Sequence, residues 1–171
     1  MTRIGVFLCT CDQKIDKSID IDAVENQLRA DAVVAQMPHV CLPDGIRALK
    51  DAIRENSLER VVVAACPVRF QQNHLRDACV DAGININHFA LVDWREGCAW
   101  VHRDDKENAT AKAIDLVQMG IARVANARAL DGVMAKITPR VLVIGGGVAG
   151  MTAARALADR GIGVTLVERE A

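Results

Sequence analysis

Residues 140–170 read RVLVIGGGVAGMTAARALADRGIGVTLVERE, and this stretch decides the fold. It opens on a short apolar run at 141–144, which is typical of a parallel strand buried on both faces. Three glycines then follow with the spacing G-x-G-x-x-G and begin an alanine-rich helical pattern. A second apolar run at 164–167 leads directly to Glu168. Strand, glycine turn, helix, strand and acid in this order predict the first βαβ unit of a dinucleotide-binding Rossmann domain.

Each glycine of this motif has its own expected task. Gly145 permits the tight turn out of the strand, Gly147 lets a pyrophosphate approach the backbone, and Gly150 lets helix and strand pack closely. The helix N-terminus adds free N–H groups and the positive end of its dipole. Glu168 lies about 20 residues further on, where it is placed to bind ribose hydroxyls. The motif predicts a dinucleotide without separating FAD from NAD, and a glycine turn in another α/β unit is the structural alternative.

The late position of the motif predicts how the chain is divided. A complete dinucleotide-binding domain needs several βα units, and residues 138–171 supply one. We therefore expect a cysteine-rich α/β domain over residues 1–137, followed by the start of an FAD-binding domain over residues 138–171. We also expect the N-terminal part of a longer flavoprotein, cut after Ala171 by truncation or by a split gene. This unit alone should bind FAD weakly or not at all.

Composition and charge exclude several functions. The formal net charge is −1, which gives no electrostatic attraction to nucleic acid or to an anionic membrane. Only 3% of the residues are aromatic, which argues against a base-stacking platform. No apolar run reaches the length of a transmembrane span, and the first residues do not form a signal peptide. We therefore expect a cytoplasmic protein with no nucleic-acid partner and no membrane insertion.

Apolar strands alternate with amphipathic helices through the first part of the chain. The predicted strands cover residues 4–8, 33–37, 61–65 and 88–92. A long helix is predicted from about residue 106 to residue 129, with an apolar stripe on one face. This alternation predicts an α/β fold with a parallel, doubly wound, Rossmann-like sheet.

The chain contains 6 cysteines. In a protein expected in the cytoplasm they point to metal or redox chemistry rather than to disulfides. Five of them fall at or just after the carboxyl ends of the predicted strands, namely Cys9, Cys11, Cys41, Cys66 and Cys98. Ligand sites in parallel α/β sheets lie at that edge. Cys79 falls in the middle of a helix, where a buried thiol acts as a small apolar side chain.

Thiols gathered at one edge have three explanations. A 4Fe–4S cluster needs four thiolates, here contributed singly by separate loops. A zinc ion would accept the same sulfurs, and free cysteines are the third possibility. No C-x-x-C pair is present to decide between them. Because alternate residues of an extended segment share a face, Cys9 and Cys11 could both be ligands, or one could be spare.

With these residues in view, the whole chain resembles the N-terminal part of the A-type subunit of heterodisulfide reductase and its relatives. Those proteins are iron–sulfur flavoproteins of electron-bifurcating complexes in methanogens and many anaerobic bacteria. The motifs that carry the resemblance are IGVFLCTC at 4–11, VCLPDG at 40–45, VVVAACPVRF at 61–70, REGCAWVH at 95–102 and VLVIGGGVAGMTAA at 141–154. One departure is Asp12, which stands where the family usually has glycine after the C-x-C.

The resemblance implies a domain with a 4Fe–4S cluster of non-standard ligation, fused to a thioredoxin-reductase-like FAD domain. The implied cluster ligands are Cys9, Cys41, Cys66 and Cys98, with Cys11 as the alternative to Cys9. The implied FAD-binding residues are Gly145, Gly147, Gly150 and Glu168. The implied function is electron transfer, in which the cluster relays electrons between the flavin and a partner subunit of a redox complex.

Two other functions stay open at this point. One is a flavin-dependent thiol/disulfide oxidoreductase, in which some of the cysteines form a redox pair. The other is a non-catalytic docking domain, zinc-bound or metal-free. Arg69 and Arg95 flank expected ligand positions, where they could either donate hydrogen bonds to the site or form surface salt bridges. We expect no catalytic residue in the ordinary sense in this chain, and a homodimer stays open.

Overall fold

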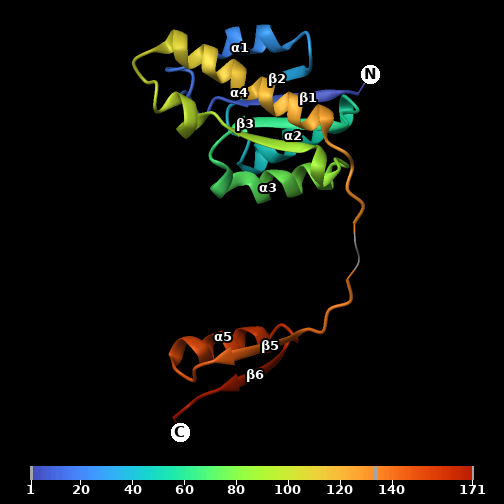
Figure 1. Cartoon of the computed structure of the whole chain (residues 1–171), viewed down its shortest axis with the longest axis vertical. Helices are drawn as coiled ribbons and strands as arrows, with labels where there is room; N and C mark the ends of the chain where they lie inside the picture. Colours follow the sequence, from blue (N-terminus) through green and yellow to red (C-terminus); the bar gives the residue numbers. More distant parts are fainter. Residues whose placement is uncertain (1, 133–134, 171) are drawn as a thin grey trace. The chain divides into compact units, whose positions relative to one another are not determined.

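The computed structural model describes residues 2–132 and 135–170. The chain divides into two compact units, Met1–Asp131 and Gly132–Ala171, each of which is described by itself (Figure 1). The domain boundary expected between residues 137 and 138 remains a prediction, because compactness alone does not show which segment folds independently.

The first unit contains the predicted parallel sheet. Its strands are β1 (Ile4–Cys9), β2 (Val33–Met37), β3 (Arg60–Ala65) and β4 (Phe89–Asp93), in the order β2-β1-β3-β4. Each neighbouring pair is parallel, so β1 and β3 form the interior of the sheet. Both interior strands are buried along almost their whole length, as the apolar runs in the sequence indicate.

Helices cover both faces of this sheet (Figure 1). Helices α1 (Ile21–Leu28) and α4 (Lys106–Asn126) pack on one face, and α2 (Pro43–Glu55) and α3 (Val68–Asp81) on the other. Successive side chains of a strand point to opposite faces, and the two cores accordingly take alternate residues of β3. The sheet is therefore doubly wound, which confirms the predicted fold class.

The order of the strands places a switch point at the carboxyl ends of β1 and β3. From β1 the chain moves outward to β2, then crosses back to β3 on the other side of β1. Loops leaving the two strands therefore diverge to opposite faces and leave a crevice, where ligands bind in sheets of this kind. Cys9 is the last residue of β1, and Cys66 directly follows β3. The fold thus brings two expected site residues to the switch point.

Two short helices flank β4. A 3-10 helix, η1 (Ile86–His88), precedes it, and a π-helix, η2 (Arg95–Ala99), follows it. Single-turn π-helices are uncommon and often occur at functional sites. The π-helix begins where Asp93 accepts hydrogen bonds from the N–H groups of Glu96 and Gly97, at 3.0 and 3.3 Å.

The second unit is the predicted βαβ unit. Strand β5 (Arg140–Ile144), helix α5 (Val148–Ala158) and strand β6 (Gly163–Val167) follow one another, and the two strands pair in parallel. The expectation that 141–144 is fully buried is wrong for this structure. Leu142 is 58% exposed and Ile144 82%, because α5 is the one helix among the described residues of this unit that packs on the two-stranded sheet.

Across the described ranges, no helix combines the length and the hydrophobicity that crossing a bilayer requires.

Candidate functional site

The loops after β1 and β2 are tied together at the carboxyl edge of the sheet. The N–H of Thr10 donates to the carbonyl oxygen of Met37 at 2.8 Å, and that of Asp12 to Pro38 at 3.2 Å. The Sγ atom of Cys9 lies 3.9 Å from the same Pro38 oxygen. Cys9 and Cys11 are therefore held beside the β2–α2 loop, which carries Cys41.

The turn after Cys9 has an unusual backbone. Cys11, Asp12 and Gln13 are consecutive left-handed residues, with φ angles of 52°, 53° and 62°. This conformation costs a residue other than glycine about 1–2 kcal/mol, and less for aspartate. Fully buried Ile15 anchors the turn through its side chain and through its N–H, which donates to Thr10 at 3.2 Å. The position of Asp12 is thus one that glycine would occupy without strain, and such strain is concentrated at functional sites.

Arg95 joins two of the thiols. Its Nη1 atom lies 3.2 Å from the Sγ of Cys66 and 3.6 Å from the Sγ of Cys11. Its guanidinium stacks on Trp100, 4.5 Å from the centre of the ring. The π-helix after β4 therefore delivers a cation to the thiols of the β1 and β3 loops. Arg69 instead pairs with Glu96 at 2.5 Å, which is the salt-bridge alternative.

Burial governs the acidity of these thiols. Burial raises the pKa of Cys66, the hydrogen bond and charge of Arg95 oppose that rise, and negative charge on Cys11 or Cys41 would add to it. Burial likewise raises the pKa of Cys9, the N–H groups of Val40 and Cys11 lower it, and charge on Cys11 and Cys66 raises it. Cys66 is therefore within electrostatic reach of Cys9, Cys11 and Cys41. Four thiolates in one place need a strong positive group to neutralise them.

The structure does not bring Cys98 into this group. Cys98 lies in the π-helix and is fully buried in the core beneath α4, where its Sγ donates to the carbonyl oxygen of Ala109 at 3.1 Å. Burial raises its pKa, Lys112 opposes the rise, and no other thiol acts on it. Cys79 is buried in the middle of α3, as expected, and burial raises its pKa to about 12. The assignment of Cys98 as a ligand stays a prediction from the resemblance.

A single metal ion would need several side chains that converge on one point. Among the residues that the structure describes, no three His, Cys, Asp or Glu side chains converge on one point that would hold a metal ion. Zinc bonds sulfur at about 2.3 Å, so its ligands must crowd together. A four-iron cluster spans wider gaps because its own irons and sulfides lie between the thiolates. The described residues therefore contain no preformed site for a single zinc ion.

The glycine turn of the second unit has the geometry that the motif predicts. Gly145 has a φ of 106°, which turns the chain sharply out of β5. A Cβ atom on Gly150 would lie 1.9 Å from the carbonyl oxygen of Gly145, so helix and turn can pack this closely only without a side chain. Gly147 caps α5 and has open space around it. Such space beside a helix N-terminus admits a phosphate group.

Glu168 closes the same turn from the end of β6. Its Oε2 accepts from the N–H of Gly146 at 2.5 Å, and its Oε1 from Arg169 at 2.6 Å and Glu170 at 3.2 Å. These N–H groups, that of Gly146 foremost, lower the pKa of Glu168. A fixed, ionised carboxylate at this place is suited to accept hydrogen bonds from ribose hydroxyls.

The comparison with protein families finds a match in the second unit. Residues 140–171 match the family described as FAD dependent oxidoreductase. The match covers β5, the glycine turn, α5, β6 and Glu168, and supports FAD as the dinucleotide.

Curated relatives extend the likeness over 98% of the chain. The chain is 41% identical to the A-type subunit of the ferredoxin/F420H2-dependent CoB-CoM heterodisulfide reductase of Methanosarcina acetivorans, of which it covers 22%. It is 40% identical to the second A-type iron-sulfur subunit of the CoB–CoM heterodisulfide reductase of Methanopyrus kandleri, covering 26%. It is 38% identical to a protein of Archaeoglobus profundus described as like the same heterodisulfide reductase subunit, covering 24%. The resemblance to this subunit is thereby confirmed, and the chain spans about a quarter of these relatives.

Proposed function

We propose that the first unit holds a 4Fe–4S cluster at the carboxyl edge of its sheet and relays single electrons between FAD and a partner subunit. The observation that carries this proposal is that Cys9, Cys11, Cys41 and Cys66 all lie on loops at the carboxyl edge of the sheet, with Arg95 donating to the sulfurs of Cys11 and Cys66. The name of one relative, an iron-sulfur subunit, supports it.

The geometry favours one set of cluster ligands over another. Cys9, Cys11, Cys41 and Cys66 share one edge, whereas the resemblance implies Cys98 in place of Cys9 or Cys11. For Cys98 to bind iron, its Sγ would have to leave the carbonyl oxygen of Ala109 and the core under α4. The first set therefore needs the smaller rearrangement of the protein.

The chain's own residues prepare the site. Arg95 offsets the negative charge of the thiolates, and hydrogen bonds to ligating sulfurs raise a reduction potential. Trp94 is fully buried and Trp100 is 38% exposed, so Trp94 is the better placed of the two to keep water from the site. When bound, an iron–sulfur cluster supplies one-electron transfer, and FAD supplies two-electron chemistry. Gly145, Gly147, Gly150 and Glu168 would hold the FAD.

Partners and compartment follow from the same proposal. The relatives are named as subunits of heterodisulfide reductases, so we infer that this chain works beside other subunits of a redox complex. All 6 cysteines are free, which suits the reducing cytoplasm. A homodimer remains a prediction.

The first test is anaerobic reconstitution of the chain with ferrous iron and sulfide, followed by metal analysis, absorption and EPR spectroscopy. We expect about four irons and four sulfides per chain. Cys66→Ala and Cys41→Ala should lose most of the iron, while Cys79→Ala is the matched control and should retain it. Cys79 is buried, as Cys66 is, but lies in the middle of α3, away from the edge.

Cys98→Ala separates the two ligand sets in the same experiment. Retained iron in Cys98→Ala, with loss in Cys9→Ala and Cys11→Ala, would support the set that the geometry favours. Loss of iron in Cys98→Ala would support the set that the resemblance implies. Zinc or no metal in the unsubstituted chain would instead leave a docking domain, and reversible oxidation of two thiols without iron would indicate a thiol/disulfide oxidoreductase.

A further inference from the structure

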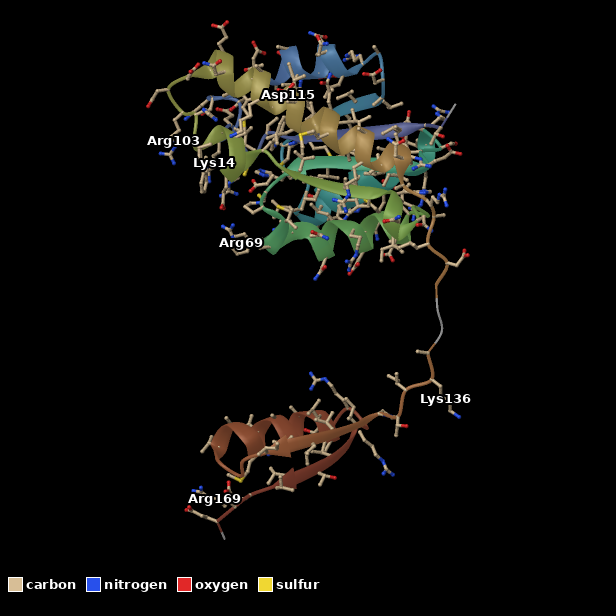
Figure 2. All side chains as sticks on the ribbon, viewed as in Figure 1. Lys14, Arg69, Arg103, Asp115, Lys136 and Arg169 are labelled. Atoms are coloured by element: carbon tan, nitrogen blue, oxygen red, sulfur yellow. The ribbon has the colours of Figure 1, made fainter. Side chains whose placement is uncertain are left out.

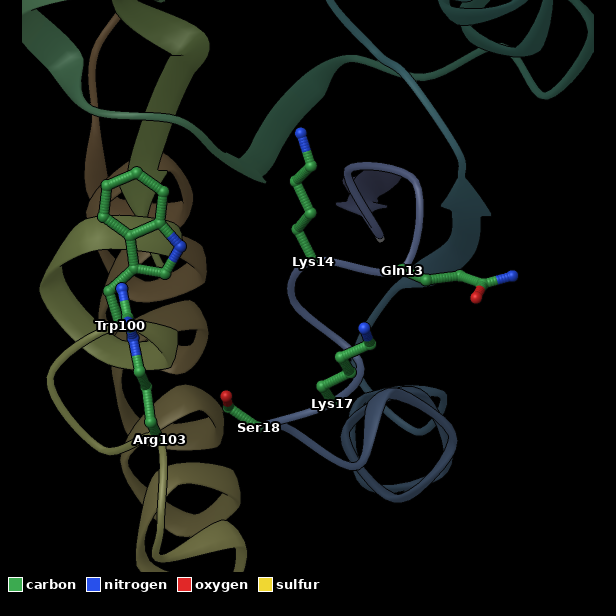
Figure 3. Close-up of a pocket in the computed structure, with 6 residues that line it drawn as sticks. All are labelled: Gln13, Lys14, Lys17, Ser18, Trp100 and Arg103. Atoms are coloured by element: carbon green, nitrogen blue, oxygen red, sulfur yellow. The ribbon is translucent and has the colours of Figure 1, made fainter.

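A pocket of about 370 Å³ opens beside the thiol site. It lies between the loop that follows β1 and the segment that leads from the π-helix to α4 (Figure 3). The residues that line it are Gln13, Lys14, Lys17, Ser18, Trp100 and Arg103.

The lining of this pocket carries charge of one sign. Lys14, Lys17 and Arg103 are all exposed, and none of the described residues that line the pocket carries a carboxylate. Within residues 2–132 and 135–170, none of these three cations forms a salt bridge. Because the net charge of the chain is −1, this positive potential is local. A concave surface lined by one sign of charge attracts the opposite charge.

One layer of side chains separates the pocket from the thiols. Trp100 is 38% exposed, and the guanidinium of Arg103 lies 5.9 Å from the centre of its ring. The same ring carries Arg95, which contacts the sulfurs of Cys66 and Cys11. Whatever occupies the pocket is therefore close to the site at which we propose electrons arrive.

The form of the pocket favours carboxylates over phosphate. Sites built for phosphate use the free N–H groups of a helix N-terminus. At both helices nearby an aspartate side chain already accepts one of these N–H groups: Asp20 accepts that of Ala23 at the start of α1, and Asp105 accepts that of Asn108 at the start of α4. The cations here stand instead on long side chains from two segments (Figure 3), and Lys14 and Arg103 lie at the same end of the unit as Arg69 (Figure 2). Spread cations beside a half-exposed tryptophan suit an acidic protein surface.

We propose that this pocket docks an acidic surface, a cluster of Asp and Glu carboxylates, on the protein that exchanges electrons with the thiol site. The partner's redox role rests on the proposed function, whereas docking itself depends only on Lys14, Lys17, Arg103 and Trp100. Docking can therefore be measured on the chain without iron, so that failure of the relay and failure of the pocket are distinguishable.

The probe is a short, fluorescently labelled oligoglutamate peptide, titrated with the unsubstituted chain and followed by anisotropy. We expect saturable binding that weakens with added salt, and a change in the emission of Trp100 upon binding. Each of Lys14→Gln, Lys17→Gln and Arg103→Gln should weaken binding roughly twofold to fivefold, and the triple variant about tenfold or more. Arg47→Gln, which removes an equally exposed charge from α2, should leave affinity unchanged.

Several outcomes would overturn the docking site. If Arg47→Gln weakened peptide binding as much as the pocket variants do, the peptide would be responding to the overall charge of the chain and not to this pocket. Tighter binding of tripolyphosphate, competing with the peptide and lost in the triple variant, would assign the pocket to a phosphate ligand. Tighter binding of single-stranded RNA would assign it to nucleic acid. All substituted side chains are exposed, so circular dichroism should show each variant folded as the unsubstituted chain is.

Discussion

The two units place different chemistry at the same point of a βα turn. In the second unit, the turn after β5 consists of glycines and leads directly into the N-terminus of α5. In the first unit, the turn after β1 contains Cys11, Asp12 and Gln13 in a left-handed backbone and presents thiols. One turn is built to admit an anion, and the other gathers groups that become anions themselves.

The difference shows how one position in the fold serves two cofactors. A pyrophosphate is bound by backbone N–H groups, so side chains at the turn only obstruct it. A metal cluster is bound by side chains, so the turn must keep them and accept backbone strain instead. In the first unit this strain is held by the packed sheet, whereas the second unit avoids it with glycine.

The largest expected effect concerns the glycine on which the Cys41 loop depends. A Cβ atom on Gly45 would lie 1.7 Å from the carbonyl oxygen of His39, which is backbone and cannot move aside cheaply. We expect Gly45→Ala to lower the free energy of unfolding of the first unit by about 3 kcal/mol. Urea denaturation followed by circular dichroism measures this loss.

Alanine substitutions at two further glycines serve as controls for Gly45→Ala. Gly132→Ala meets nothing within 4 Å and should leave the denaturation midpoint where it was. Gly150→Ala would make an equally close contact, 1.9 Å, but within the second unit, so the first unit should unfold as before. A shift of the first transition by Gly150→Ala would show that the units do not behave independently.

The next effect is a dependence of the free energy of unfolding on the ionisation of buried thiols. Only the first unit can show it, since all 6 cysteines lie in that unit. Burial raises the pKa of Cys79 from 9.0 to about 12, so the folded state favours the protonated thiol. The stabilisation that the protonated Cys79 thiol gives to the folded state is complete below pH 9.0 and is lost as the pH rises toward 12. In this window the free energy of unfolding should fall by about 1.4 kcal/mol per pH unit for this thiol.

Cys79→Ala isolates this contribution. When denaturation is measured at a series of pH values above 9.0, the free energy of unfolding should fall less steeply with pH for the variant than for the unsubstituted chain. Equal slopes would mean that the thiol is ionised in the folded state, and that α3 is more open than its burial indicates.

Much of this comparison was predictable from the sequence. Apolar runs indicated the four strands of the first sheet, and the glycine spacing predicted the βαβ unit with Glu168 at its end. The alternation of strands and helices predicted a parallel sheet with Cys9 and Cys66 at its carboxyl edge, whereas the strand order that creates the switch point is known from the structure.

The rest depends on tertiary packing that sequence patterns do not encode. Cys98 follows β4 in sequence, yet the π-helix turns its side chain under α4. Ile144 is more exposed than expected. An apolar run indicates that a strand is suited to burial, but it does not show which helices or strands cover it. The contact between Arg95 and two thiols joins residues up to 84 positions apart. The left-handed turn had one sequence signal, Asp12 at a position where the family has glycine.

The smallest expected effect tests the strain in that turn directly. Asp12 has a φ of 53°, and glycine adopts this conformation without steric cost. The relief of about 1 kcal/mol is partly offset by the greater entropy of glycine in the unfolded chain, so we expect Asp12→Gly to stabilise the first unit by about 0.5 kcal/mol. Asp104→Gly, at an exposed position without a positive φ, should not stabilise it. Chemical denaturation of both variants measures the difference, and a loss of stability in Asp12→Gly would mean that the aspartate itself, rather than the packed sheet, holds the turn in place.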